Sequence, residues 1–139
     1  MSLSTDAKLA IQELLSRAAY SLDERIEDVL AACFAEDAEF SLRIAGGDLV
    51  GPFTGREGIM TLMTDSFAQQ TDQRRHVVSN IFFESWDKQK ATVLSNLTLF
   101  ATENDEIRLI TAGVYKDEVV HNDGEWLLHR RHLNLDLPY

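Results

Sequence analysis

The second half of the chain constrains the fold most, because it holds four β-rich runs separated by short polar breaks. The runs lie at about residues 76–86, 91–102, 108–120 and 125–135. The breaks, at residues 87–88, 103–105 and 121–124, have the length and composition of hairpin loops. Together the four runs predict an antiparallel meander of long strands.

The first half of the chain has helical periodicity instead. Ser4 and Thr5 can cap a helix over about residues 5–21, and a second, short helix carries an apolar stripe from Ile26 to Phe34. Residues 38–44 roughly alternate between apolar and polar, and residues 46–48 supply a turn back to a short strand at 49–50. Thr54 and Glu57 have the spacing of a capping box at the start of a third helix, which should end near Gln69.

Helices followed by antiparallel strands predict an α+β fold in which the helices cover one face of the sheet. A length of 139 residues, 45% of them apolar, suits a single domain over residues 1–139. The strands carry apolar residues on both faces, as in Leu97 and Leu99 opposite Leu94 and Phe100. We therefore expect a second copy to cover the outer face, in a homodimer or larger homo-oligomer.

Charge and cysteine content restrict which binding partners and which cellular compartment we expect for the protein. The formal charge of −10 repels phosphate backbones and anionic lipid, so neither nucleic acid nor a membrane is expected as a partner. The longest uncharged stretches are strand-sized, well short of a membrane span. Cys33 is the lone cysteine, and the first residues lack the pattern of a signal peptide, which predicts a cytoplasmic protein.

Short motifs in a fixed order give a further indication of the fold. They lie at residues 11–14 leading to Asp23, and at residues 34–38, 55–59, 75–80, 113–117 and 123–126. In this order they resemble the SnoaL-like group of the nuclear transport factor 2-like superfamily over nearly the whole chain. The resemblance implies a cystatin-like cone, in which three N-terminal helices pack on a curved antiparallel sheet and enclose a deep apolar pocket.

The same resemblance indicates a catalytic pair. Members that perform eliminations, among them scytalone dehydratase and hexachlorocyclohexane dehydrochlorinase, use an Asp at the position matching Asp23 and a His matching His76. An Asp that accepts a hydrogen bond from one ring nitrogen leaves the other nitrogen free to remove a proton. The alternative from the residues alone is that Asp23 caps a helix and His76 is a strand-start residue bonded to water.

We therefore expect a cofactor-independent lyase, dehydratase-like, or an isomerase that acts on a small apolar cyclic or aromatic substrate. His76 would be the general base and Asp23 would orient it. Two alternatives stay open. One is a noncatalytic small (beta) subunit of an aromatic-ring-hydroxylating dioxygenase, and the other is a small-molecule binding module.

Further polar residues are candidates for binding the substrate, namely Tyr20, Asn80, Asn96, Tyr115 and Arg130. On the last strand, strict alternation puts Arg130 on one face with Trp126, Leu128, His132 and Asn134, and Arg131 on the other with Leu127, His129, Leu133 and Leu135. We expect the Arg130 set to face the pocket.

No metal site is expected. His129 and His132 are three positions apart on a predicted strand and therefore point to opposite faces. The chain also lacks paired cysteines and a His-Glu-x-x-His helix. The proposed chemistry accordingly calls for no metal and no other cofactor.

Overall fold

The computed structural model describes residues 2–139, so Met1, the first residue of the predicted domain, lies outside the described residues. Its helices are α1 (Thr5–Asp23), α2 (Glu27–Ala32) and α3 (Gly55–Gln69). Its strands are β1 (Phe34–Ile44), β2 (Val50–Thr54), β3 (Gln73–Trp86), β4 (Lys90–Glu103), β5 (Glu106–Asn122) and β6 (Glu125–Leu135). The order of elements agrees with the sequence prediction.

The strands form one six-stranded sheet in the order β2-β1-β6-β5-β4-β3. The predicted meander is confirmed, since each strand from β3 to β5 pairs antiparallel with the next strand in the sequence, and so is the β1–β2 hairpin. The sheet is mixed rather than wholly antiparallel, because β1 pairs with β6 in parallel. Residue periodicity predicts a strand but not its pairing direction, which depends on where the chain returns to the sheet.

Local sequence explains most element boundaries. Ser4 caps α1 through its hydroxyl oxygen, which accepts a hydrogen bond from the Ala7 backbone N–H at 3.1 Å. At α3 the predicted capping box is wrong, because Thr54 occupies the N-cap position without a side-chain hydrogen bond. Phe34 begins β1 instead of ending α2, and its side chain is fully buried in the core.

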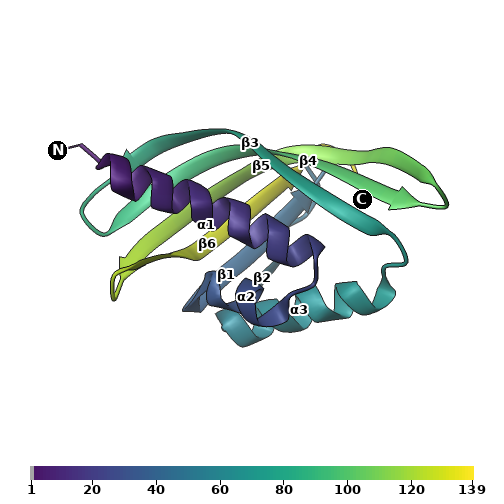
Figure 1. Cartoon of the computed structure of the whole chain (residues 1–139), viewed down its shortest axis with the longest axis horizontal. Coiled ribbons are helices and arrows are strands. Elements are labelled where there is room, and N and C mark those ends of the chain that lie inside the picture. Colours follow the sequence, from purple (N-terminus) through teal and green to yellow (C-terminus); the bar gives the residue numbers. More distant parts are fainter. Residues whose placement is uncertain (1) are drawn as a thin grey trace.

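The helices cover one face of the curved sheet (Figure 1). Helix α1 crosses the sheet against β3, whereas α3 packs on β1 and β2. The face toward the helices is apolar, and Val93, Leu97 and Leu99 of β4 are all buried there. The opposite face keeps apolar side chains partly exposed to solvent, among them Val77, Phe82, Ile107, Leu109 and Val114.

A β-bulge changes which residues of β6 point toward the helices. Glu118 pairs with Arg130, but the next residue, Val119, pairs with Leu128, so His129 is an extra residue in the ladder. As a result Leu128 and Arg131 are both buried although they are three positions apart. From the bulge onward the prediction for β6 is wrong, because Arg131, Leu133 and Leu135 point inward.

Among the described residues, no helix is long and apolar enough to span a membrane.

Candidate active site

Side-chain contacts hold the C-terminus of α1 against the start of β3. The backbone oxygen of Asp23 accepts a hydrogen bond from the Gln73 side-chain amide at 2.9 Å. Next to it, Glu24 forms an ion pair with Arg75. These contacts join residues about fifty positions apart in the sequence, and they bring Asp23 beside His76.

Both carboxylate oxygens of Asp23 bind His76. Oδ2 accepts a hydrogen bond from the His76 backbone N–H at 2.8 Å, and Oδ1 is 2.5 Å from the ring nitrogen Nδ1. The two side chains are only 6% and 15% exposed, which matches the sequence prediction for this pair. The alternative that His76 is bonded only to water is therefore wrong.

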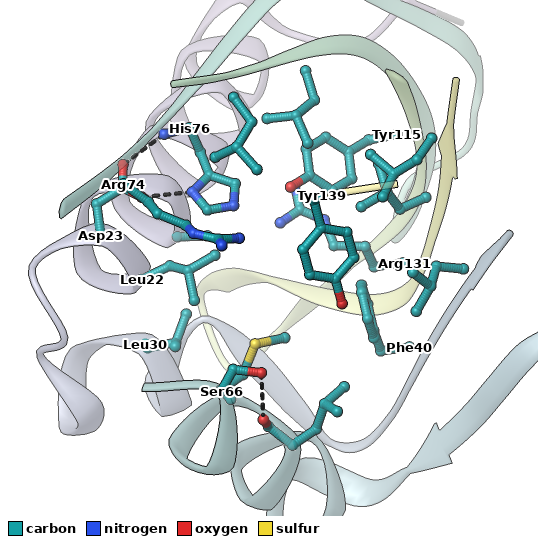
Figure 2. A pocket seen from close by; sticks show the side chains of 18 of the residues that line it. Leu22, Asp23, Leu30, Phe40, Ser66, Arg74, His76, Tyr115, Arg131 and Tyr139 are labelled. Carbon is teal, nitrogen blue, oxygen red and sulfur yellow. Dashed lines mark hydrogen bonds and ion pairs between the residues drawn. The ribbon is translucent and has the colours of Figure 1, made fainter. Parts of the chain in front are cut away.

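This geometry sets the tautomer of the imidazole. An ionised carboxylate only accepts hydrogen bonds, so Nδ1 carries the proton that lies between it and Asp23. In the neutral ring Nε2 is then unprotonated and holds a free lone pair. Figure 2 shows the imidazole of His76 projecting into a cavity, with its second nitrogen turned away from Asp23. The arrangement suits a general base.

The cavity lies between the helices and the inner face of the sheet and is largely apolar. The centre of a water-sized sphere can reach about 180 Å³ of its volume. A single water needs roughly 10–15 Å³ on this measure, so the cavity accommodates a small organic molecule. The lining includes Phe34, Phe40, Phe53, Met63, Phe67 and Leu97. Val50 and Tyr139 also line it and are 42% and 57% exposed, so the cavity opens to solvent on their side.

On the wall opposite Asp23 and His76, a second set of polar side chains, which includes Arg131 and Tyr115, faces the cavity (Figure 2). Arg131 donates two hydrogen bonds to Asp117, from Nε to Oδ1 at 2.9 Å and from Nη2 to Oδ2 at 3.2 Å. Its guanidinium lies 3.8 Å from the centre of the Tyr115 ring. Asp117 is fully buried, and both Arg131 and Tyr115 line the cavity.

Burial and charge decide the protonation of this group. Burial opposes the charged form of Arg131, but the adjacent Asp117 carboxylate raises the pKa of Arg131 above its ordinary value, so the guanidinium stays charged. Burial also raises the pKa of Tyr115, although Arg131 opposes this, so its hydroxyl stays protonated at neutral pH. This wall of the cavity therefore presents hydrogen-bond donors.

Of the five predicted substrate-binding residues, only Tyr115 lines the cavity. Tyr20 is 61% exposed on the solvent side of α1. Asn80 is exposed at a β-bulge in β3, and Asn96 faces outward between the buried residues Ser95 and Leu97. Arg130 lies on the outer face with its side chain 64% exposed, 3.8 Å from Glu39, because the bulge in β6 turns Arg131 inward in its place.

Five polar residues of the cavity were not predicted from the sequence, namely Ser66, Gln70, Arg74, Arg131 and Tyr139. The alternation of β3 could have indicated Arg74, because a residue two positions before His76 shares its face. For Arg131 no local signal was available, since the bulge depends on pairing with β5. Tyr139 follows the last strand, and the hydrogen bond from the Thr111 hydroxyl to the Leu137 backbone oxygen, at 2.7 Å, holds that segment against β5.

Residues 2–139 contain no group of three or more His, Cys, Asp or Glu side chains placed to hold a metal ion.

The curved sheet, the helices on one face and the cavity between them define an α+β protein of the cystatin-like, nuclear transport factor 2-like class. Comparison with known families gives the particular family. A model described as a SnoaL-like domain matches residues 4–132, and the chain belongs to this family.

Individual relatives are more distant. Gamma-hexachlorocyclohexane dehydrochlorinase from Sphingobium indicum is 27% identical over 127 residues, which cover 90% of this chain and 78% of the relative. A protein of unknown function with a cystatin-like fold from Nostoc punctiforme is 26% identical, with a TM-score of 0.83 over 99% of this chain and 98% of that one.

A candidate beta subunit of an aromatic-ring-hydroxylating dioxygenase from Novosphingobium aromaticivorans superposes with a TM-score of 0.81. The match covers 96% of this chain and 91% of that chain. The two sequences are only 18% identical, so this similarity concerns the fold alone.

Proposed function

We propose that the protein is a cofactor-independent lyase or isomerase that removes a proton from a small cyclic or aromatic substrate. The observation that carries the proposal is the Asp23–His76 pair, in which Nδ1 lies 2.5 Å from the carboxylate while the ring projects into an apolar cavity. The similarity to a dehydrochlorinase, an enzyme that removes hydrogen chloride, supports an elimination reaction.

In this proposal His76 Nε2 takes the proton and becomes an imidazolium. Asp23 stabilises that charge and holds the ring through its two hydrogen bonds. The opposite wall, with the protonated Tyr115 hydroxyl and the Arg131 guanidinium, receives negative charge that develops on the substrate or leaving group. The scheme uses only side chains of this chain.

Two probe reactions test the proposal. Chloride release from γ-hexachlorocyclohexane measures elimination, and deuterium uptake by 2-tetralone in D₂O measures proton removal next to a ketone. We expect the wild type to accelerate at least one of them. His76→Ala should lower that rate by roughly a hundred- to ten-thousand-fold, the usual contribution of a general base.

Asp23→Asn tests the role of the carboxylate separately. If the amide oxygen of Asn accepts from the His76 backbone N–H, its NH₂ group faces Nδ1, which moves the ring proton to Nε2 and removes the base. We expect a loss comparable to that of His76→Ala.

His121→Ala is the matched control, because His121 is exposed and contacts Trp126 away from the cavity. Undiminished turnover in a folded His76→Ala protein would contradict the proposal. Binding of both compounds to the wild type without turnover would favour a small-molecule binding module instead.

A further inference from the structure

Arg74 lies next to the proposed base in the sheet. It is two residues before His76 on β3, and both side chains line the cavity. Alternate residues of a strand share one face, and their Cα atoms are roughly 6.6 Å apart. Figure 2 shows Arg74 and His76 extending into the cavity from the same side. The spacing lets the two side chains contact neighbouring atoms of one small substrate.

The guanidinium of Arg74 is held at one end and free at the other. Its Nε donates to the Asp72 carboxylate at 3.1 Å, and its Cζ lies 5.6 Å from the centre of the Tyr139 ring. Its side chain is only 16% exposed. Within residues 2–139, Nη1 and Nη2 hydrogen bond no other residue. A charged group with these donors still available beside a cavity is placed to bind an oxygen atom of a ligand.

The rest of the cavity also favours a ligand that accepts hydrogen bonds. Arg131 and the protonated Tyr115 hydroxyl are donors on the opposite wall. The Tyr139 hydroxyl and the Gln70 amide can both donate and accept, and the Ser66 hydroxyl, which donates to the Leu62 backbone oxygen at 3.0 Å, can accept. A hydrocarbon or halocarbon would leave the Arg74 donors without a partner, which costs binding free energy.

We propose that Arg74 determines the substrate class, and that the substrate is an enolisable carbonyl compound, a small cyclic or aromatic ketone. This rests on the proposed function of His76 as base. The carbonyl oxygen binds the Nη atoms of Arg74, and the carbon next to the carbonyl presents its hydrogen to Nε2 of His76. The pleat of β3 fixes the distance between the two contacts.

The reaction is balanced without any further reactant. The C–H bond breaks, its proton moves to Nε2, and its electron pair forms a C=C bond while the carbonyl π pair moves onto oxygen. Arg74 stabilises the resulting enolate oxygen, which carries more negative charge than the carbonyl did. In an isomerisation the imidazolium returns the proton to another carbon, and in a dehydration it protonates a departing hydroxyl, which leaves as water.

Arg131 is less suited to this role. Two of its nitrogens donate to Asp117, whose negative charge offsets the attraction of the guanidinium for a substrate oxygen, and it lies on the wall opposite the base. Arg74 has one nitrogen bonded to a carboxylate and shares a strand with His76. In this proposal Arg74 therefore donates the hydrogen bonds to the substrate oxygen nearest the reacting carbon.

Binding of two bicyclic probes tests the proposal. The first is 2-naphthol, whose oxygen on a planar ring resembles that of an enolate, and the second is naphthalene, which lacks the oxygen. A hydrogen bond to a charged group corresponds to a preference of roughly 10- to 150-fold for 2-naphthol in the wild type. Arg74→Met should abolish this preference without lowering the affinity for naphthalene, because no donor is then left unpaired beside the hydrocarbon.

Arg75→Met is the matched control. It removes the same charge one residue away, from a side chain that is 53% exposed and paired with Glu24. It should keep the preference for 2-naphthol. Arg74→Lys, which retains a charge but not the planar fork, should keep a reduced preference. Thermal melting of each variant checks that it is folded.

Two outcomes overturn the proposal: a 2-naphthol preference that persists in folded Arg74→Met, or a wild type that shows none, whether it binds both probes equally or neither.

The base function is tested separately. His76→Ala should keep the 2-naphthol preference, because oxygen binding does not require the base. In the deuterium exchange of 2-tetralone, Arg74→Met should lower kcat and kcat/KM together, as expected for a contact that strengthens in the transition state. If the preference depends on Arg74 but the wild type neither exchanges deuterium nor releases chloride, oxygen recognition stands and the proposed base function fails.

Discussion

The buried pair of Arg131 and Asp117 gives the prediction with the largest expected effect on stability. Asp117 has no exposed surface, and the Arg131 side chain is 7% exposed and bonded to it at 2.9 and 3.2 Å. Arg131→Met leaves the carboxylate buried without its partner. Breaking a buried pair in this way costs about 3–5 kcal/mol of unfolding free energy. For a chain of this length that corresponds to a fall in Tm of roughly 10–20 °C.

The loss should depend on pH. Burial raises the pKa of Asp117, and Arg131 is the group that opposes the shift. Without Arg131, the folded protein binds a proton on Asp117 more tightly than the unfolded chain does. Stability therefore falls as the pH rises above the ordinary Asp pKa of about 3.9. The deficit of Arg131→Met relative to wild type should be larger at pH 8 than at pH 5.

Urea unfolding followed by circular dichroism measures both effects. Arg130→Met is the matched control, because Arg130 lies next in the same strand, mostly exposed, and should cost less than about 1 kcal/mol. The double variant Asp117→Leu/Arg131→Met removes both charges and should be more stable than Arg131→Met alone. A loss below about 1 kcal/mol in Arg131→Met would refute this reasoning.

Three further predictions concern other parts of the molecule. Gly113→Ala should destabilise the protein by about 1–3 kcal/mol in urea unfolding, because its Cβ would lie 2.3 Å from the Asn134 backbone oxygen. Gly58→Ala, in open space on α3, should not destabilise it. Because burial raises the pKa of Tyr115, folding holds its proton more tightly, so stability should fall as the pH rises above about 10, and less so in Tyr115→Phe. We propose that the outer sheet face joins copies of the chain. Light scattering at micromolar concentration should show a dimer or larger assembly that Phe82→Glu weakens, and a monomeric wild type would contradict this.

Much of the fold could be predicted because its signals are local. The helical periodicity of residues 5–21 and the four long β-rich runs specify element types without reference to the rest of the chain. The predicted boundaries of the elements were less accurate, since β3 begins at Gln73, three residues before the predicted start. That difference places Arg74 on the strand and on the same face as His76.

The candidate site was predictable only in part. Asp23 and His76 were paired through the resemblance to a family, and the structure joins them by two hydrogen bonds. Tyr115 was also placed correctly in the cavity. The choice of Arg130 over Arg131 failed, because strict alternation was extended through a strand that contains an extra residue.

The sequence by itself determined the order and type of the elements and the α+β class. The tertiary structure alone decided the parallel pairing of β1 with β6, the bulge at His129 and the donor-rich wall of the cavity. The physical reason is the range of the interactions. Periodicity and capping act within a few residues, whereas pairing direction and bulges depend on hydrogen bonds between strands far apart in the chain.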